Sequence, residues 1–80
     1  MDKNVVIYST PTCHFCQMTK DYFAENGITY TNYDVAHDLD KRQEMIQKSG
    51  QMGVPVITIG DELIVGFDKE RLASALGLAA

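Results

Sequence analysis

The sequence lacks the features that mark most membrane, nucleic-acid-binding and exported proteins. None of its apolar runs approaches the ~18 residues that a membrane span needs. Basic side chains are few, seven against eleven acidic ones, and the net charge of −4 argues against a broad phosphate-binding surface. Residues 1–4 are polar and lead directly into a strand-like run, so we expect no secretory signal and a cytoplasmic protein.

Internal repeats, low-complexity stretches and linker-like blocks are also missing. The chain of eighty residues is far shorter than two domains of ~100–200 residues each. It is long enough for a core, because domains of ~55–65 residues often fold alone. We therefore expect residues 1–80 to form one domain.

Cysteine is scarce, and the two cysteines present, Cys13 and Cys16, lie close together. A disulfide between them would close a very small loop and stabilise little, unlike the spread cysteines of exported scaffolds. A tetrahedral zinc site needs four ligands, but His14 lies between the cysteines and His37 has no partner. The CxxC pair therefore favours redox chemistry over a structural or metal-binding role.

Apolar periodicity and turn residues predict seven elements in the order β-α-β-α-β-β-α. The strands are expected at 5–8, 29–34, 54–59 and 62–65, and the helices from residue 13 to Gly27, at 39–49 and after Phe67. A right-handed crossover makes the first two strands parallel, and the turn at Gly60 and Asp61 makes the last two antiparallel. The expected fold is α/β, a four-stranded mixed sheet flanked by three helices.

The CxxC pair opens the first predicted helix, and this position assigns different roles to its two thiols. The positive end of a helix dipole favours a thiolate at Cys13, and thiolates are the attacking species in disulfide exchange. Cys16 lies one helical turn further and is close enough to attack a mixed disulfide on Cys13. Cys13 is thus the predicted nucleophile and Cys16 the resolving thiol. His14 is either a cation that supports the thiolate or an exposed helix residue without a role.

The chain resembles the glutaredoxins, a group with a thioredoxin-like fold, over nearly its whole length. The matching segments are 8–16, 41–50, 53–55 and 66–68. The resemblance implies a dithiol oxidoreductase that reduces protein disulfides and glutathione mixed disulfides. It implies glutathione as reductant, no tightly bound cofactor or metal, and a monomer whose partners are glutathione and disulfide-containing proteins.

The resemblance also implies that Pro55 is cis and packs against the cysteine pair. The backbone of Val54 would then hydrogen-bond an extended substrate, including the cysteinyl part of glutathione. A simpler interpretation of Pro55 is that it begins an edge strand. Gly53, where many relatives have threonine, leaves this loop a less restricted backbone.

Further glutathione contacts follow from the resemblance position by position. Phe15 provides an aromatic wall, and Asp68 meets the γ-glutamyl ammonium or simply caps the last helix. Gln51 stands where relatives often carry arginine or another polar residue. Lys41 and Arg42 either contact the glycyl carboxylate or belong to a solvated helix face.

The predicted site also includes Thr12, Gly66 and Phe67. Two features of the sequence indicate an alternative reductant. Thr10 replaces a lysine that is frequent in glutathione-using relatives, and Gly66-Phe67 resembles redoxins that thioredoxin reductase reduces and that serve ribonucleotide reductase. A flavoprotein reductase is therefore an alternative partner.

Two further functions stay open. Because His14 replaces the proline that is frequent between the cysteines, an iron–sulfur carrier using Cys13 and glutathione is permitted. The remaining alternative, an interaction module with idle cysteines, is disfavoured by the intact CxxC at the start of a helix.

Overall fold

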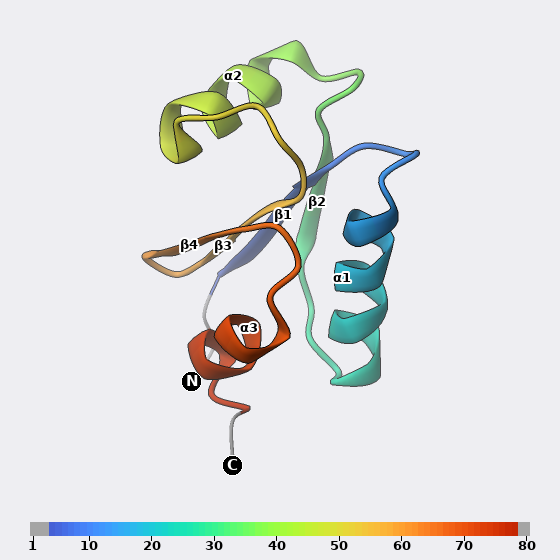
Figure 1. Cartoon of the computed structure of the whole chain (residues 1–80), viewed down its shortest axis with the longest axis vertical. Coiled ribbons are helices and arrows are strands. Elements are labelled where there is room, and N and C mark those ends of the chain that lie inside the picture. The colour runs from blue at the N-terminus through green and yellow to red at the C-terminus, as the bar shows by residue number, and fades with distance from the viewer. Residues whose placement is uncertain (1–3, 79–80) are drawn as a thin grey trace.

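A computed structural model describes residues 4–78, which form seven elements in the predicted order (Figure 1). The strands are β1 (Val5–Ser9), β2 (Thr31–Asp34), β3 (Val56–Ile59) and β4 (Glu62–Val65), and the helices are α1 (His14–Glu25), α2 (Leu39–Ser49) and α3 (Lys69–Leu76). The strands form one sheet in the order β2-β1-β3-β4. β1 is parallel to β2, and the pairs β1–β3 and β3–β4 are antiparallel. The predicted four-stranded mixed sheet with three helices is confirmed.

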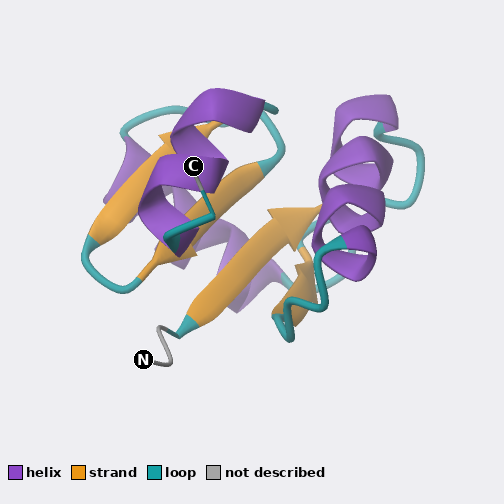
Figure 2. Cartoon of the chain, turned by 90° about the horizontal axis from the view of Figure 1, so that it is seen from below, coloured by secondary structure: helices purple, strands orange, loops and turns teal. Residues whose placement is uncertain are grey.

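The central strands divide the core into two layers because successive side chains point to opposite faces of a sheet. On β1, Ile7 faces α1 and α3, where it packs with Phe23 and Leu72. Tyr8 faces the other side, where it packs with Met45 of α2. Figure 2 shows α1 and α3 on one face of the sheet and α2 behind it.

Each helix begins at a side chain that satisfies an otherwise free backbone N–H group. Cys13 is the N-cap of α1, Asp38 accepts a hydrogen bond from the N–H of Lys41, and Asp68 accepts one from Arg71. The helices contain 12, 11 and 8 residues. Within residues 4–78, none is both long and apolar enough to cross a membrane.

Two strands begin later than the sequence predicts. β2 starts at Thr31 rather than at residue 29, because its pairing with β1 begins there, where Thr31 lies opposite Val6. β3 starts at Val56 rather than at residue 54, because Pro55 has no N–H to donate to a neighbouring strand.

Candidate active site

The two cysteines occupy different environments at the start of α1. Both are free thiols; Cys13 is partly exposed, whereas only 1% of Cys16 is exposed. The Sγ atom of Cys13 accepts a hydrogen bond from the backbone N–H of Cys16 at 3.1 Å. The Sγ atom therefore lies at the positive end of the α1 dipole, with a backbone N–H group directed at it. Cys13 is thus accessible, and its sulfur is held by a hydrogen bond at the start of the helix.

Burial raises the pKa of the Cys16 thiol well above its ordinary value, and its hydrogen bond with Cys13 adds to the increase. The backbone of Thr10 and the ammonium group of Lys20 act in the opposite direction. Burial and the hydrogen bond with Cys13 both favour the protonated form of Cys16 in the free protein. This asymmetry matches a nucleophile and a resolving thiol.

The strand pairing brings three separate segments to the edge of the sheet where the cysteine pair lies. Val56 pairs with Tyr8 of β1 on one side and with Val65 of β4 on the other. Three segments therefore lie together at one end of the strands: the loop after β1, the residues before Val56 and the residues after Val65. A hydrogen bond of 2.8 Å from the N–H of Gly66 to the carbonyl of Pro55 joins the last two segments.

The segment before β3 contains the predicted cis bond, between Val54 and Pro55. Pro55 is fully buried. Within residues 4–78, neither the N–H nor the carbonyl of Val54 has a hydrogen-bond partner. This peptide segment is therefore free to pair with an extended ligand by strand addition.

The comparisons with known proteins agree with this geometry. The glutaredoxin family model matches residues 5–64. This chain belongs to the glutaredoxin family. Of its relatives, a glutaredoxin-like 8.6 kDa protein in the rubredoxin operon of Clostridium pasteurianum is 46% identical over 68 residues, which cover 85% of this chain and 91% of the relative. Glutaredoxin 3 of Escherichia coli is 35% identical over 74 residues, covering 92% and 89%.

The solved structures support the same fold. A glutaredoxin from Archaeoglobus fulgidus matches with a TM-score of 0.85 at 22% identity, covering 92% of this chain and 86% of that one. Membership of the glutaredoxin family implies thiol–disulfide oxidoreductase activity in general, and glutathione is the reductant that the family uses. Within residues 4–78 of this glutaredoxin-family chain, no group of three or more His, Cys, Asp or Glu side chains is placed to hold a metal ion.

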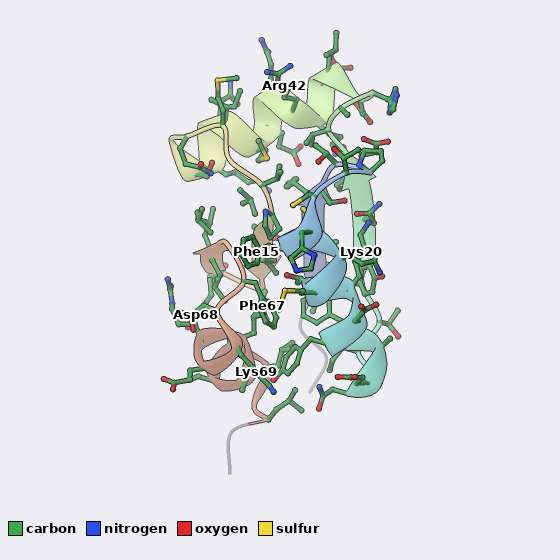
Figure 3. All side chains as sticks on the ribbon, turned by 45° about the vertical axis from the view of Figure 1, so that its right-hand side comes forward. Phe15, Lys20, Arg42, Phe67, Asp68 and Lys69 are labelled. Atoms are coloured by element: carbon green, nitrogen blue, oxygen red, sulfur yellow. The ribbon has the colours of Figure 1, made fainter. Side chains whose placement is uncertain are left out.

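The predicted aromatic and acidic residues border the same edge of the sheet. Phe15, on the first turn of α1, is 55% exposed, and the ring of His14 meets it edge-on at 5.6 Å. Phe67 is half-buried and lies against Tyr22 of α1, with ring centroids 6.1 Å apart. In Figure 3 both phenylalanine rings are seen between α1 and the segment leading into α3, where Asp68 begins the helix. The N-cap role of Asp68 is confirmed.

The four remaining polar residues of the predicted site are Lys41, Arg42, Thr12 and Gln51. The Nζ atom of Lys41 lies 3.3 Å from Glu44 and 4.3 Å from the centre of the Tyr33 ring. Arg42 is exposed and points away from Phe15 in Figure 3. Neither base has a hydrogen bond or ion pair with another predicted site residue in the described range. Thr12 is exposed beside Cys13, and the amide of Gln51 is bound within its own loop.

Two groups were missed from the sequence. Lys20 is half-buried, and its positive charge acts to lower the pKa of the Cys16 thiol. The spacing of four residues between Cys16 and Lys20 on the predicted helix would have indicated this proximity. The hydroxyl of Tyr8 donates to Glu44 at 2.5 Å, and this bond, followed by the one from Lys41, lowers the pKa of Glu44. No local pattern indicated that bond, because it joins residues 36 positions apart.

The raised pKa of Cys16 predicts selective alkylation. At pH 7–9, iodoacetamide should modify Cys13 in a Cys16→Ser variant but leave Cys16 largely unmodified in a Cys13→Ser variant, since burial, the largest cause of the raised pKa, persists there. In urea, Cys16 should react with iodoacetamide at the rate of an unperturbed thiol. Rapid modification of folded Cys16 at pH 7 would contradict its assignment as a buried thiol with a raised pKa.

The same raised pKa predicts a pH dependence of stability. The thiol of Cys16 keeps its proton in the folded state at pH values where an unfolded thiol has lost it, so the free energy of unfolding should fall as the pH rises above about 9.

Proposed function

We propose that this chain is a cytoplasmic, single-domain, monomeric glutathione-dependent oxidoreductase that reduces protein disulfides and glutathione mixed disulfides. The observation that carries the proposal is the accessible Cys13 Sγ, which accepts an N–H bond at the start of α1 and is backed by the buried thiol of Cys16. Family membership supports the reaction class.

In the first step, the Cys13 thiolate attacks one sulfur of the substrate disulfide. A Cys13–substrate disulfide forms, and the other substrate sulfur leaves as a thiolate. With a protein disulfide, the Cys16 thiol loses its proton and attacks Cys13 Sγ, which releases the second substrate thiolate and oxidises the pair. With a glutathione mixed disulfide, a second glutathione thiolate attacks the glutathione sulfur that is bound to Cys13. Oxidised glutathione forms, the bond to Cys13 breaks, and the Cys13 thiolate is released. Two glutathione molecules likewise reduce the oxidised pair.

The free peptide groups of Val54 are proposed to pair with the cysteinyl part of glutathione, beside Pro55 and Gly66. The exposed ring of Phe15 and the half-buried ring of Phe67 would provide apolar walls. Thr12 lies beside the nucleophile, and the Asp68 carboxylate would meet the ammonium group of the γ-glutamyl part. Lys41 and Arg42 would contact the glycyl carboxylate, with Lys41 exchanging its ion pair with Glu44 for that contact.

The choice of reductant is tested by NADPH consumption with a small mixed disulfide. We expect turnover with glutathione and glutathione reductase. Turnover only with thioredoxin reductase would contradict glutathione dependence and support the redoxin alternative, with a flavoprotein reductase as partner. A brown protein after anaerobic purification would instead support iron–sulfur binding through Cys13.

The Asp68→Asn variant tests glutathione recognition. Asparagine caps helices about as well as aspartate, so α3 should remain intact while the negative charge is lost. Because one partly exposed charge contact is removed, we expect the KM for glutathione to rise about fivefold with little change in kcat. Asp61→Asn, in the turn at the opposite edge of the sheet, is the matched control. An unchanged KM in the Asp68 variant would leave Asp68 with the capping role alone.

A further inference from the structure

The loop between α2 and β3 has an internal set of hydrogen bonds made by the side chain of Gln51. Its Oε1 atom accepts from the N–H of Gly53 at 2.5 Å, and its Nε2 atom donates to the carbonyl of Gly53 at 3.1 Å. The same Nε2 atom lies 3.3 Å from the hydroxyl of Ser49, which in turn lies 2.7 Å from the carbonyl of Met45. One side chain thus connects the loop to the last turn of α2. We call this arrangement the Gln51 brace.

Gly53 makes room for the Gln51 brace. Its φ angle is not in the left-handed region, so the backbone there does not require glycine. A Cβ atom at this position, however, would lie 2.6 Å from the Oε1 atom of Gln51. The obstacle would be the end of a flexible side chain, so alanine would displace the Gln51 amide and leave the surrounding fold in place.

We propose that Gln51 and Gly53 are a matched positioning pair that holds the ligand-binding loop in its binding conformation before any ligand arrives. Gln51 then acts through the loop rather than by contacting glutathione. This inference rests on the proposed function, because it takes the backbone of Val54 as the recognition element.

The pattern of occupied and free peptide groups supports this role. Both peptide groups of Gly53 are occupied by Gln51, whereas those of Val54, the next residue, are free within the described residues. The brace therefore leaves one residue open for pairing with a ligand. Met52, the residue before Gly53, is 59% exposed. When only a fraction of molecules has a binding-competent loop, the apparent affinity falls by that fraction.

The kinetic test compares Gln51→Ala, Gly53→Ala and the double variant, with Gln47→Ala on the exposed face of α2 as the control. Each single change breaks the same pair of hydrogen bonds, so each should raise the KM for a glutathione mixed disulfide by about tenfold with kcat nearly unchanged. The double variant should be no worse than either single variant, because the alanine at position 53 then meets no side chain. A wild-type KM for Gly53→Ala, or additive effects in the double variant, would overturn the proposal.

Amide hydrogen exchange of the free protein tests the brace without any substrate. The N–H of Gly53 should be protected in the wild type and in Gln47→Ala, and should exchange at least about tenfold faster in Gln51→Ala. Equal exchange in the wild type and Gln51→Ala would overturn the brace. If the wild type showed no thiol–disulfide oxidoreductase activity, the proposed function would be wrong. The amide hydrogen exchange of Gly53 would still decide whether the Gln51 brace exists.

Discussion

Replacing Cys13 by serine should abolish thiol–disulfide exchange, by at least about a thousandfold, because a serine hydroxyl is not ionised at neutral pH and does not form the mixed disulfide. Cys16→Ser should have a different effect. Cys13 would still form a mixed disulfide with glutathione, and a second glutathione would release it. Reduction of protein disulfides should fall strongly, because the buried thiol that attacks Cys13 is missing.

The two variants are compared in two assays, one with a glutathione mixed disulfide of a small thiol and one with a protein disulfide. Circular dichroism and urea unfolding establish that both variants are folded, which matters most for the buried position. If Cys13→Ser and Cys16→Ser lose both activities to the same extent, the assignment of nucleophile and resolving thiol is wrong.

Local signals in the sequence predicted most of the fold. Gly60 and Asp61 between two apolar segments indicated the β3–β4 turn, and Gly27 and Gly50 marked the ends of α1 and α2; all three glycines have positive φ angles in the structure. The strand starts were less accurate, because they depend on which backbone groups find a partner. Because Pro55 has no N–H to donate, the pairing of β3 with β1 begins at Val56.

The candidate site was predictable where its chemistry is local and was not predictable where it depends on side-chain geometry. The spacing of Cys13 and Cys16 and their place at a helix start could be predicted from the sequence, and the structure confirms that α1 begins there. The nearly complete burial of Cys16 could not be predicted from the sequence, because it depends on how α1 packs against the rest of the chain. Gln51 was predicted as a ligand contact, but its amide is bound to Gly53, and no periodicity encodes that choice of partner.

The register of the sheet explains how short local motifs become one site. Pairing of Tyr8, Val56 and Val65 across three adjacent strands aligns the segments that follow or precede them. The segments contribute different groups: the thiols follow β1, the free peptide groups of Val54 precede β3, and an aromatic ring and a carboxylate follow β4. A shift of one residue in this register would reverse the faces of the strand and separate the groups.

Phe23 and Phe15 lie on the same helix, and substitution by alanine should affect stability at the first position and ligand binding at the second. Phe23 is fully buried against both the sheet and Tyr30, with ring centroids 5.3 Å apart. Phe23→Ala should therefore lower the free energy of unfolding by about 3–5 kcal/mol. This is a large part of the ~4–12 kcal/mol expected for a domain of this size. The loss would loosen the docking of α1, whose first turn holds the cysteine pair.

Phe15→Ala removes a ring that is 55% exposed, so the free energy of unfolding should change by no more than about 0.5 kcal/mol. Its effect should appear in the KM for mixed disulfides, which we expect to rise about fivefold if a ligand covers the ring. Urea unfolding and steady-state kinetics on both variants separate the two roles. A destabilised Phe15→Ala protein, or a Phe23→Ala protein as stable as the wild type, would contradict the packing of α1. An unchanged KM in Phe15→Ala would remove its ring from the binding surface and leave Phe67 as the aromatic wall.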